Sequence, residues 1–156
     1  MIVQKSKSGF SLIEMLVAIG IVMILFSAGI ASYRNATRNQ ALDSDVALII
    51  QVLNIAKTNV NSGKKIACAD LSINLPLKYW QVKFFSDYFE LQEICEDGTA
   101  DGKLFVNNSY KLASKNIIST NPSSIFLFKA LGQGATAGTI NIGAKIITVN
   151  SIGIIQ

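Results

Sequence analysis

The sequence predicts an α+β fold in which one long N-terminal helix packs on an antiparallel β-sheet. Two observations predict it. Residues 10–62 form an apolar stretch followed by an amphipathic one, with no proline before Pro76 to interrupt a helix. After Gly63, short β-prone runs alternate with turn residues. We therefore divide the chain into four segments: 1–9, 10–32, 33–62 and 63–156.

The segment 10–32 is predicted to span a membrane. Half of the 156 residues are hydrophobic and 15% are charged, and the apolar excess is concentrated here. The plainly polar residues between positions 10 and 31 are Ser11, Glu14 and Ser27. As a helix this stretch rises about 33 Å, enough to cross the hydrocarbon core of a bilayer. We expect a single pass, with the C-terminal domain outside the cytoplasm.

The residues before the span differ from an ordinary secretory signal. The apolar stretch is too long for the core of such a signal, and no small-x-small cleavage site follows it. Instead, Gly9 lies at the change from polar to apolar residues. Flanking charge does not decide the orientation by a count, because lysines precede the span and arginines follow it. A short basic N-terminus before a long remainder favours a cytoplasmic N-terminus.

The start of the chain carries a family resemblance. The stretch Lys7-Ser8-Gly9-Phe10-Ser11-Leu12-Ile13-Glu14-Met15-Leu16-Val17-Ala18-Ile19 resembles the cleavage and methylation motif of type IV prepilins and type II secretion pseudopilins. The resemblance implies that a prepilin peptidase cuts between Gly9 and Phe10, making residues 1–9 a leader, and that Phe10 is then methylated. It also implies that Glu14 serves assembly by neutralising the amine of a neighbouring subunit.

The position of Glu14 within the apolar segment is also unusual on physical grounds. An ionised carboxylate within a membrane helix costs on the order of 2 to 3 kcal/mol, so it needs a partner or a purpose. Cleavage after Gly9 would create an amine on Phe10, about one helical turn away. The alternative is a carboxylate that extends to the lipid headgroups.

The segment 33–62 is predicted to continue the helix with one apolar face. Apolar residues recur at spacings of four and three, as one helix face requires: Leu42, Val46, Ile49, Leu53, Ala56 and Val60. Gly63 is a suitable C-terminal cap. The alternative is two helices with a break near residues 29–35.

The segment 63–156 is predicted to form strands with one buried face. Alternation is clearest in Val82-Lys83-Phe84 and in Phe89-Glu90-Leu91-Gln92. The expected strands are 80–85, 88–94, 103–106, 116–119, 124–128, 138–142 and 145–155. Turn residues separate them, including Asn107-Asn108 and Asn121-Pro122.

The end of the chain carries a second resemblance. Ile125-Phe126-Leu127-Phe128, Thr139-Ile140-Asn141-Ile142 and Ile147-Thr148-Val149-Asn150-Ser151-Ile152-Gly153 resemble the closing strands of the minor-pilin and minor-pseudopilin branch.

Cys68 and Cys95 are the two cysteines. An even number in a translocated domain is typical of a disulfide. The alternative is two buried thiols.

Catalysis is not indicated, and no residue pattern indicates a cofactor. The chain has no histidine, no Gly-x-Ser-x-Gly elbow and no phosphate-binding Gly-Lys-Ser/Thr. The loop from Asp97 to Gly102 places Asp97, Thr99 and Asp101 at the first, third and fifth positions of a calcium loop. Asn108 stands where the twelfth position needs an acid, so an ordinary turn is the competing interpretation.

The lysines from position 57 onward offer a weak nucleic-acid signal. They could bind DNA phosphates together, but they are scattered among acids, and a solvated surface is the simpler interpretation. They are Lys57, Lys64, Lys65, Lys78, Lys83, Lys103, Lys111, Lys115, Lys129 and Lys145.

Together these features predict a non-enzymatic assembly subunit, a minor pilin or pseudopilin anchored in the cytoplasmic membrane before it enters a filament. Expected partners are the prepilin peptidase, other pilin or pseudopilin subunits and an inner-membrane assembly platform. One alternative is a DNA- or surface-binding minor pilin of a DNA-uptake filament. Another is a membrane-anchored protein that never polymerises.

Overall fold

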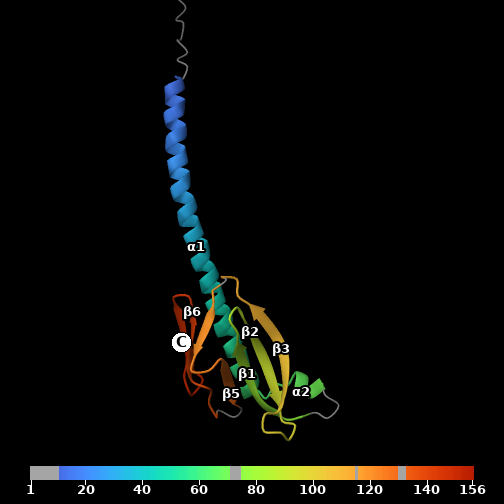
Figure 1. Ribbon diagram of the computed structural model, residues 1–156. Helices are drawn as coiled ribbons and strands as arrows, with labels where there is room; N and C mark the ends of the chain where they lie inside the picture. The colour runs from blue at the N-terminus through green and yellow to red at the C-terminus, as the bar shows by residue number, and fades with distance from the viewer. Residues whose placement is uncertain (1–10, 71–74, 115, 130–132) are drawn as a thin grey trace, which may run out of the picture. The chain divides into compact units, whose positions relative to one another are not determined.

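The computed structural model describes residues 11–70, 75–114, 116–129 and 133–156 (Figure 1). The chain forms two compact units, Met1–Asn39 and Gln40–Gln156. Helix α1 (Leu12–Asn61) contributes residues to both. It continues through residues 29–35 without interruption, which confirms the single helix and excludes the expected alternative of a break there.

Helix α1 ends in a glycine cap. Gly63 has a φ of +63°, a backbone conformation that residues with a Cβ rarely adopt. The Lys64 N–H donates to the Asn59 carbonyl at 2.8 Å, and the Gly63 N–H donates to the Val60 carbonyl at 3.2 Å. This pair of bonds is a Schellman motif, and it satisfies carbonyls that the helix end would leave unpaired.

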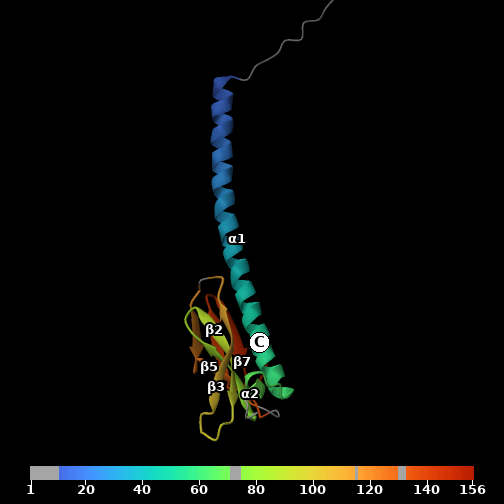
Figure 2. The same ribbon diagram turned by 90° about the vertical axis from the view of Figure 1, so that its right-hand side faces the viewer.

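The unit Gln40–Gln156 contains two antiparallel sheets (Figures 1 and 2). One has the order β3-β2-β1-β5, and the other has the order β4-β6-β7. The strands are β1 (Leu77–Phe84), β2 (Tyr88–Cys95), β3 (Lys103–Lys111), β4 (Ile118–Asn121), β5 (Ile125–Lys129), β6 (Gly138–Ile142) and β7 (Lys145–Val149). The α+β prediction is thus confirmed, with two sheets where we expected one.

One hydrophobic core joins both sheets to the C-terminal part of α1. The predicted helix stripe is confirmed: Ile49, Leu53, Ala56 and Val60 are buried, and Leu42 and Val46 pack partly buried against them. The sheets contribute Trp80, Val82, Phe84, Phe89, Leu91, Phe126, Phe128, Ile140, Ile142, Ile147 and Val149. The alternating strand residues therefore face the helix, as the pattern predicted.

The structure corrects three expectations about the chain after Gly63. Asn107-Asn108 is not a turn, because β3 runs through it with a register shift opposite Leu91 and Gln92. The last predicted strand, 145–155, ends at Val149, and the chain then folds back so that Ile155 pairs with Val149. A short helix, α2 (Ala67–Asp70), was not predicted.

Candidate functional site

Ser11 and Glu14 form a reciprocal cap at the start of α1. The Ser11 N–H donates to Glu14 Oε2 at 2.9 Å, and the Glu14 N–H donates to Ser11 Oγ at 3.3 Å. This arrangement is a capping box, in which two backbone donors at the helix start are satisfied by side chains. The Glu14 carboxylate is thus bonded to the backbone of Ser11, the first described residue.

The residues that follow Glu14 expose an apolar surface. Every side chain from Ser11 to Ser27 is exposed, including Leu12, Met23 and Phe26. The most apolar 18-residue window of α1 has a mean hydropathy of 2.4, and none of it is buried. Among the described residues, α1 is the one helix that is long and apolar enough to cross a membrane.

The two residues of the expected cleavage site, Gly9 and Phe10, lie outside the described residues. Residues 4–30, which include them, match the family model of the prokaryotic N-terminal methylation motif. The chain carries this motif. The methylation motif supports the resemblance to type IV pilins and pseudopilins, a class of structural rather than catalytic subunits. It implies processing by a prepilin peptidase and assembly with other pilins.

Beyond the methylation motif, a search of curated proteins and a search of solved structures found no match to the chain.

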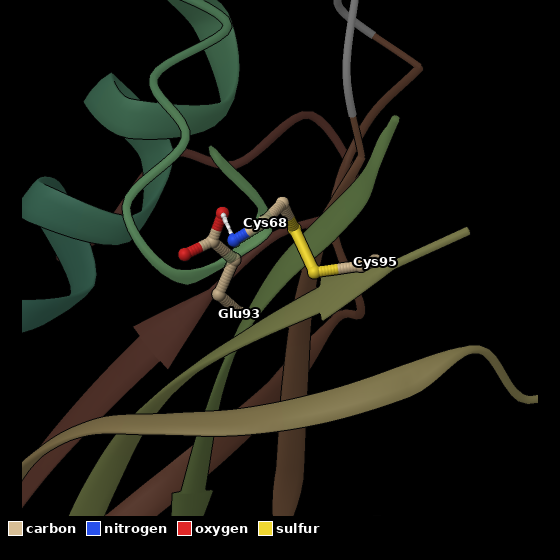
Figure 3. A group of neighbouring side chains, drawn as sticks. All are labelled: Cys68, Glu93 and Cys95. Atoms are coloured by element: carbon tan, nitrogen blue, oxygen red, sulfur yellow. Dashed lines mark hydrogen bonds between the residues drawn. A yellow bond between two sulfur atoms is a disulfide. The ribbon is translucent and has the colours of Figure 1, made fainter. Parts of the chain in front are cut away.

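In the domain 63–156 the two cysteines are joined by a disulfide. Cys68 on α2 and Cys95 at the end of β2 form a disulfide, with their Cα atoms 5.7 Å apart (Figure 3). Both residues are fully buried. The described part of the chain holds no free cysteine.

Glu93 lies beside this disulfide. No role for it was predicted from the sequence. It is fully buried, and its carboxylate accepts hydrogen bonds from the backbone N–H groups of Ile66, Ala67 and Cys68. Figure 3 shows the bond from the Cys68 N–H. The carboxylate and the two sulfurs lie within 4.8 Å of one another. Sulfurs joined in a disulfide are not thiolates, so the three groups are not a set of metal ligands in this state.

The predicted calcium loop connects β2 to β3, so strands flank it where a calcium-binding helix pair would have helices. Asp97 Oδ1 accepts hydrogen bonds from the Thr99 hydroxyl at 2.6 Å and the Thr99 N–H at 3.0 Å. These two hydrogen bonds lower the pKa of Asp97, and the bond from the Thr99 hydroxyl has the larger effect. The Lys78 ammonium donates to the carbonyls of Thr99 and Ala100. A positive charge at these carbonyls opposes a cation there, and calcium binding stays a prediction.

Several of the lysines weighed for DNA binding have partners within the protein. Lys57 Nζ donates to the Gly153 carbonyl at 2.8 Å, and Lys145 pairs with Asp43 at 3.0 Å. The ammonium groups of Lys83 and Lys103 lie over the rings of Phe85 and Phe105. Lys115 lies outside the described residues. The structure therefore gives no specific support to a phosphate-binding face, and DNA binding stays a prediction.

Sequence reasoning also missed Asp45. This residue of α1 is 2% exposed, and its two carboxylate oxygens accept the N–H groups of Ala113 and Ser114 at 2.9 and 2.8 Å. The signal available in the sequence was the position of Asp45, three residues after Leu42 and four before Ile49, which places an acid on the apolar face of the helix. That signal did not reveal the partners, because they lie 68 and 69 residues away.

Proposed function

We propose that the chain is a structural and assembly subunit, a minor pilin or pseudopilin, of a type IV pilus or a type II secretion pseudopilus. The observation that carries this proposal is the methylation motif at the start of a long, exposed, apolar helix. Residues 10–32 anchor the subunit in the cytoplasmic membrane until the assembly platform moves it into a filament with other subunits. The part from 33 to 62 continues the helix into the domain 63–156.

Processing removes residues 1–9 by a cut between Gly9 and Phe10, and Phe10 is methylated. The geometry at Ser11 supports a role for Glu14 in the next step. The Glu14 carboxylate already bonds the N–H of Ser11, the residue that follows Phe10 in the sequence. The carboxylate can therefore pair with an amine at this depth, its own or that of a neighbouring subunit. Pairing would offset the cost of placing a charge within the membrane.

The domain 63–156 lies outside the cytoplasm in this proposal. The Cys68–Cys95 disulfide supports this location, because structural disulfides persist in oxidising compartments. The minor branch is favoured by the resemblance of the closing strands, which fall on β5, β6 and β7.

The assembly role of Glu14 is tested with a pair of variants that separate charge from helix capping. Glu14→Gln, and equally Glu14→Leu, removes the charge, whereas Ser11→Ala removes one capping hydroxyl and leaves the carboxylate in place. Each chain is produced in cells that contain the pilus or secretion machinery, and its amounts in membranes and in sheared filaments are compared. We expect the Glu14 variants to insert but remain in the membrane fraction, and Ser11→Ala to reach filaments. Normal incorporation of Glu14→Gln would refute the role.

A further inference from the structure

A buried carboxylate and a disulfide hold the same segment of the chain. Glu93 on β2 accepts the Ile66 N–H at 3.1 Å on either oxygen, the Ala67 N–H at 2.8 Å and the Cys68 N–H at 3.4 Å. The same segment is bonded to Cys95, two residues further along β2 (Figure 3). The hydrogen bonds and the covalent bond therefore join residues 66–68 to the same stretch of β2.

The charge of Glu93 is compensated by backbone amides. Within the described residues, the ion pair found is Lys145–Asp43, so no lysine or arginine nitrogen lies within ion-pair distance of Glu93. An ionised group buried without a cation is unfavourable unless hydrogen bonds satisfy it. Three successive N–H groups, with the Asn107 amide at 3.5 Å, supply those bonds. These donors hold their positions only while residues 66–68 lie on the sheet.

Among the described residues, few other polar contacts fix this segment before oxidation. Helix α2 has four residues, too few to be stable through its own hydrogen bonds. The nearest other polar anchor among the described residues is the Trp80 Nε1–H, which donates to the Lys64 carbonyl at 3.1 Å. That anchor lies four residues before Cys68, whereas Glu93 bonds the Cys68 N–H itself.

We propose that Glu93 is a positioning residue for the disulfide: its carboxylate holds residues 66–68 against β2 in the reduced chain, so that Cys68 already lies beside Cys95 when the bond forms. Oxidation then links Cys68 to Cys95 in a segment, residues 66–68, that already lies on β2. The inference does not depend on the proposed filament function.

The chemical step requires an external disulfide as oxidant. The Cys68 and Cys95 thiols lose two protons and two electrons, one S–S bond forms between them, and the S–S bond of the oxidant is reduced to two thiols. With glutathione disulfide as the oxidant, the products are the protein disulfide and two molecules of glutathione. The equilibrium constant of this exchange measures how well the folded chain places its two thiols together.

An equilibrium measurement at pH 7 separates positioning from charge effects on reactivity. A nearby carboxylate disfavours thiolates and would by itself slow thiol attack, so rates would mix two opposing effects. Unperturbed thiols have a pKa near 8.5 and are mostly protonated at pH 7. The equilibrium constant then reports mainly on geometry.

The test equilibrates the full chain in detergent micelles with mixtures of reduced and oxidised glutathione. The oxidised fraction is read by alkylation and intact mass. We expect Glu93→Gln to lower the equilibrium constant by about tenfold or more, because charge-assisted hydrogen bonds to the segment are lost. The matched control is Glu90→Gln on the same strand, whose carboxylate bonds Gln92 and which should stay within about twofold of the unmodified chain. An equally small change in Glu93→Gln would overturn the proposal.

A second measurement needs no change at Glu93, in case that variant does not fold. In the chain carrying Cys68→Ser and Cys95→Ser, amide hydrogen exchange is followed at residues 66, 67 and 68. We expect these amides to stay protected without the disulfide, because the carboxylate still binds them. Exchange at the rate of an unstructured segment, in a chain whose β2 amides remain protected, would overturn the proposal.

Discussion

Glu14 and Ser11 bond each other's backbone N–H groups at the first turn of α1, through Glu14 Oε2 and Ser11 Oγ. The acid of the methylation motif is therefore part of the helix start, and its carboxylate is directed toward the preceding residues. The proposed pairing with an amine on Phe10 would use this end of the helix. The capping box thus gives a physical reason for an acid three residues after Ser11, in addition to its proposed role in assembly.

Replacing Gly9 by valine is expected to block processing. Bulk at the residue before the cut would displace the backbone from the cleft of a peptidase, so the full-length chain should accumulate in the membrane. The matched control is Gly20→Ala, because a Cβ at Gly20 meets nothing within 4 Å. Intact mass spectrometry of membrane extracts checks both variants. A mature chain beginning at Phe10 from the Gly9→Val variant would count against the cleavage site.

Asp45 is expected to contribute much more to stability than its neighbour Asp43. Asp45→Ala leaves the N–H groups of Ala113 and Ser114 without their buried acceptor, and should lower the free energy of unfolding by about 2 to 3 kcal/mol. Asp43→Ala removes an ion pair with Lys145 whose side chains are 63% and 53% exposed, so it should cost less than about 1 kcal/mol. Urea unfolding in detergent, with the disulfide intact, measures both. Equal losses would contradict the assignment.

Gly102 and Gly98 are expected to differ as sites for alanine. Both have positive φ, +74° and +87°, which costs an L-residue roughly 1 to 2 kcal/mol. A Cβ at Gly102 would in addition lie 2.6 Å from the Cys95 carbonyl oxygen, whereas at Gly98 it meets nothing within 4 Å. Gly102→Ala should therefore destabilise the domain clearly more than Gly98→Ala. Comparable unfolding midpoints for the two variants would show that the turn relaxes around the added methyl group.

The pKa of Asp97 is expected to lie below its ordinary value of 3.8, because hydrogen bonds from the Thr99 hydroxyl and N–H favour the ionised form. A lowered pKa in the folded state means that this contribution to stability is complete above 3.8. It is lost as the pH falls through the folded-state pKa. An NMR titration of the Asp97 carboxyl checks the value, and Thr99→Val should move it upward. A midpoint at or above 3.8 in the unmodified chain would contradict the hydrogen bonds.

Patterns of apolar residues predicted most of this fold. The stripe that includes Ile49 and Leu53 predicted the buried face of α1, and the alternation around Val82 and Phe89 predicted the buried faces of β1 and β2. These patterns are visible in sequence because each depends on residues two to four positions apart.

Contacts between distant residues were not predictable in the same way. Glu93 and Asp45 each bind backbone amides, which every residue carries, so no residue type marks the partner. Asn107 continues β3 with an irregular register although its sequence favours a turn, because pairing along β2 outweighs the local preference. The return of Ile155 to Val149 likewise depends on a tertiary pairing.

The most direct test of the filament account is the intact mass of the native polypeptide, purified from cells that contain its processing enzyme. The account predicts a chain that begins at Phe10, lacks residues 1–9 and carries one additional methyl group on its N-terminal amine. A polypeptide that still begins at Met1 under these conditions would contradict it.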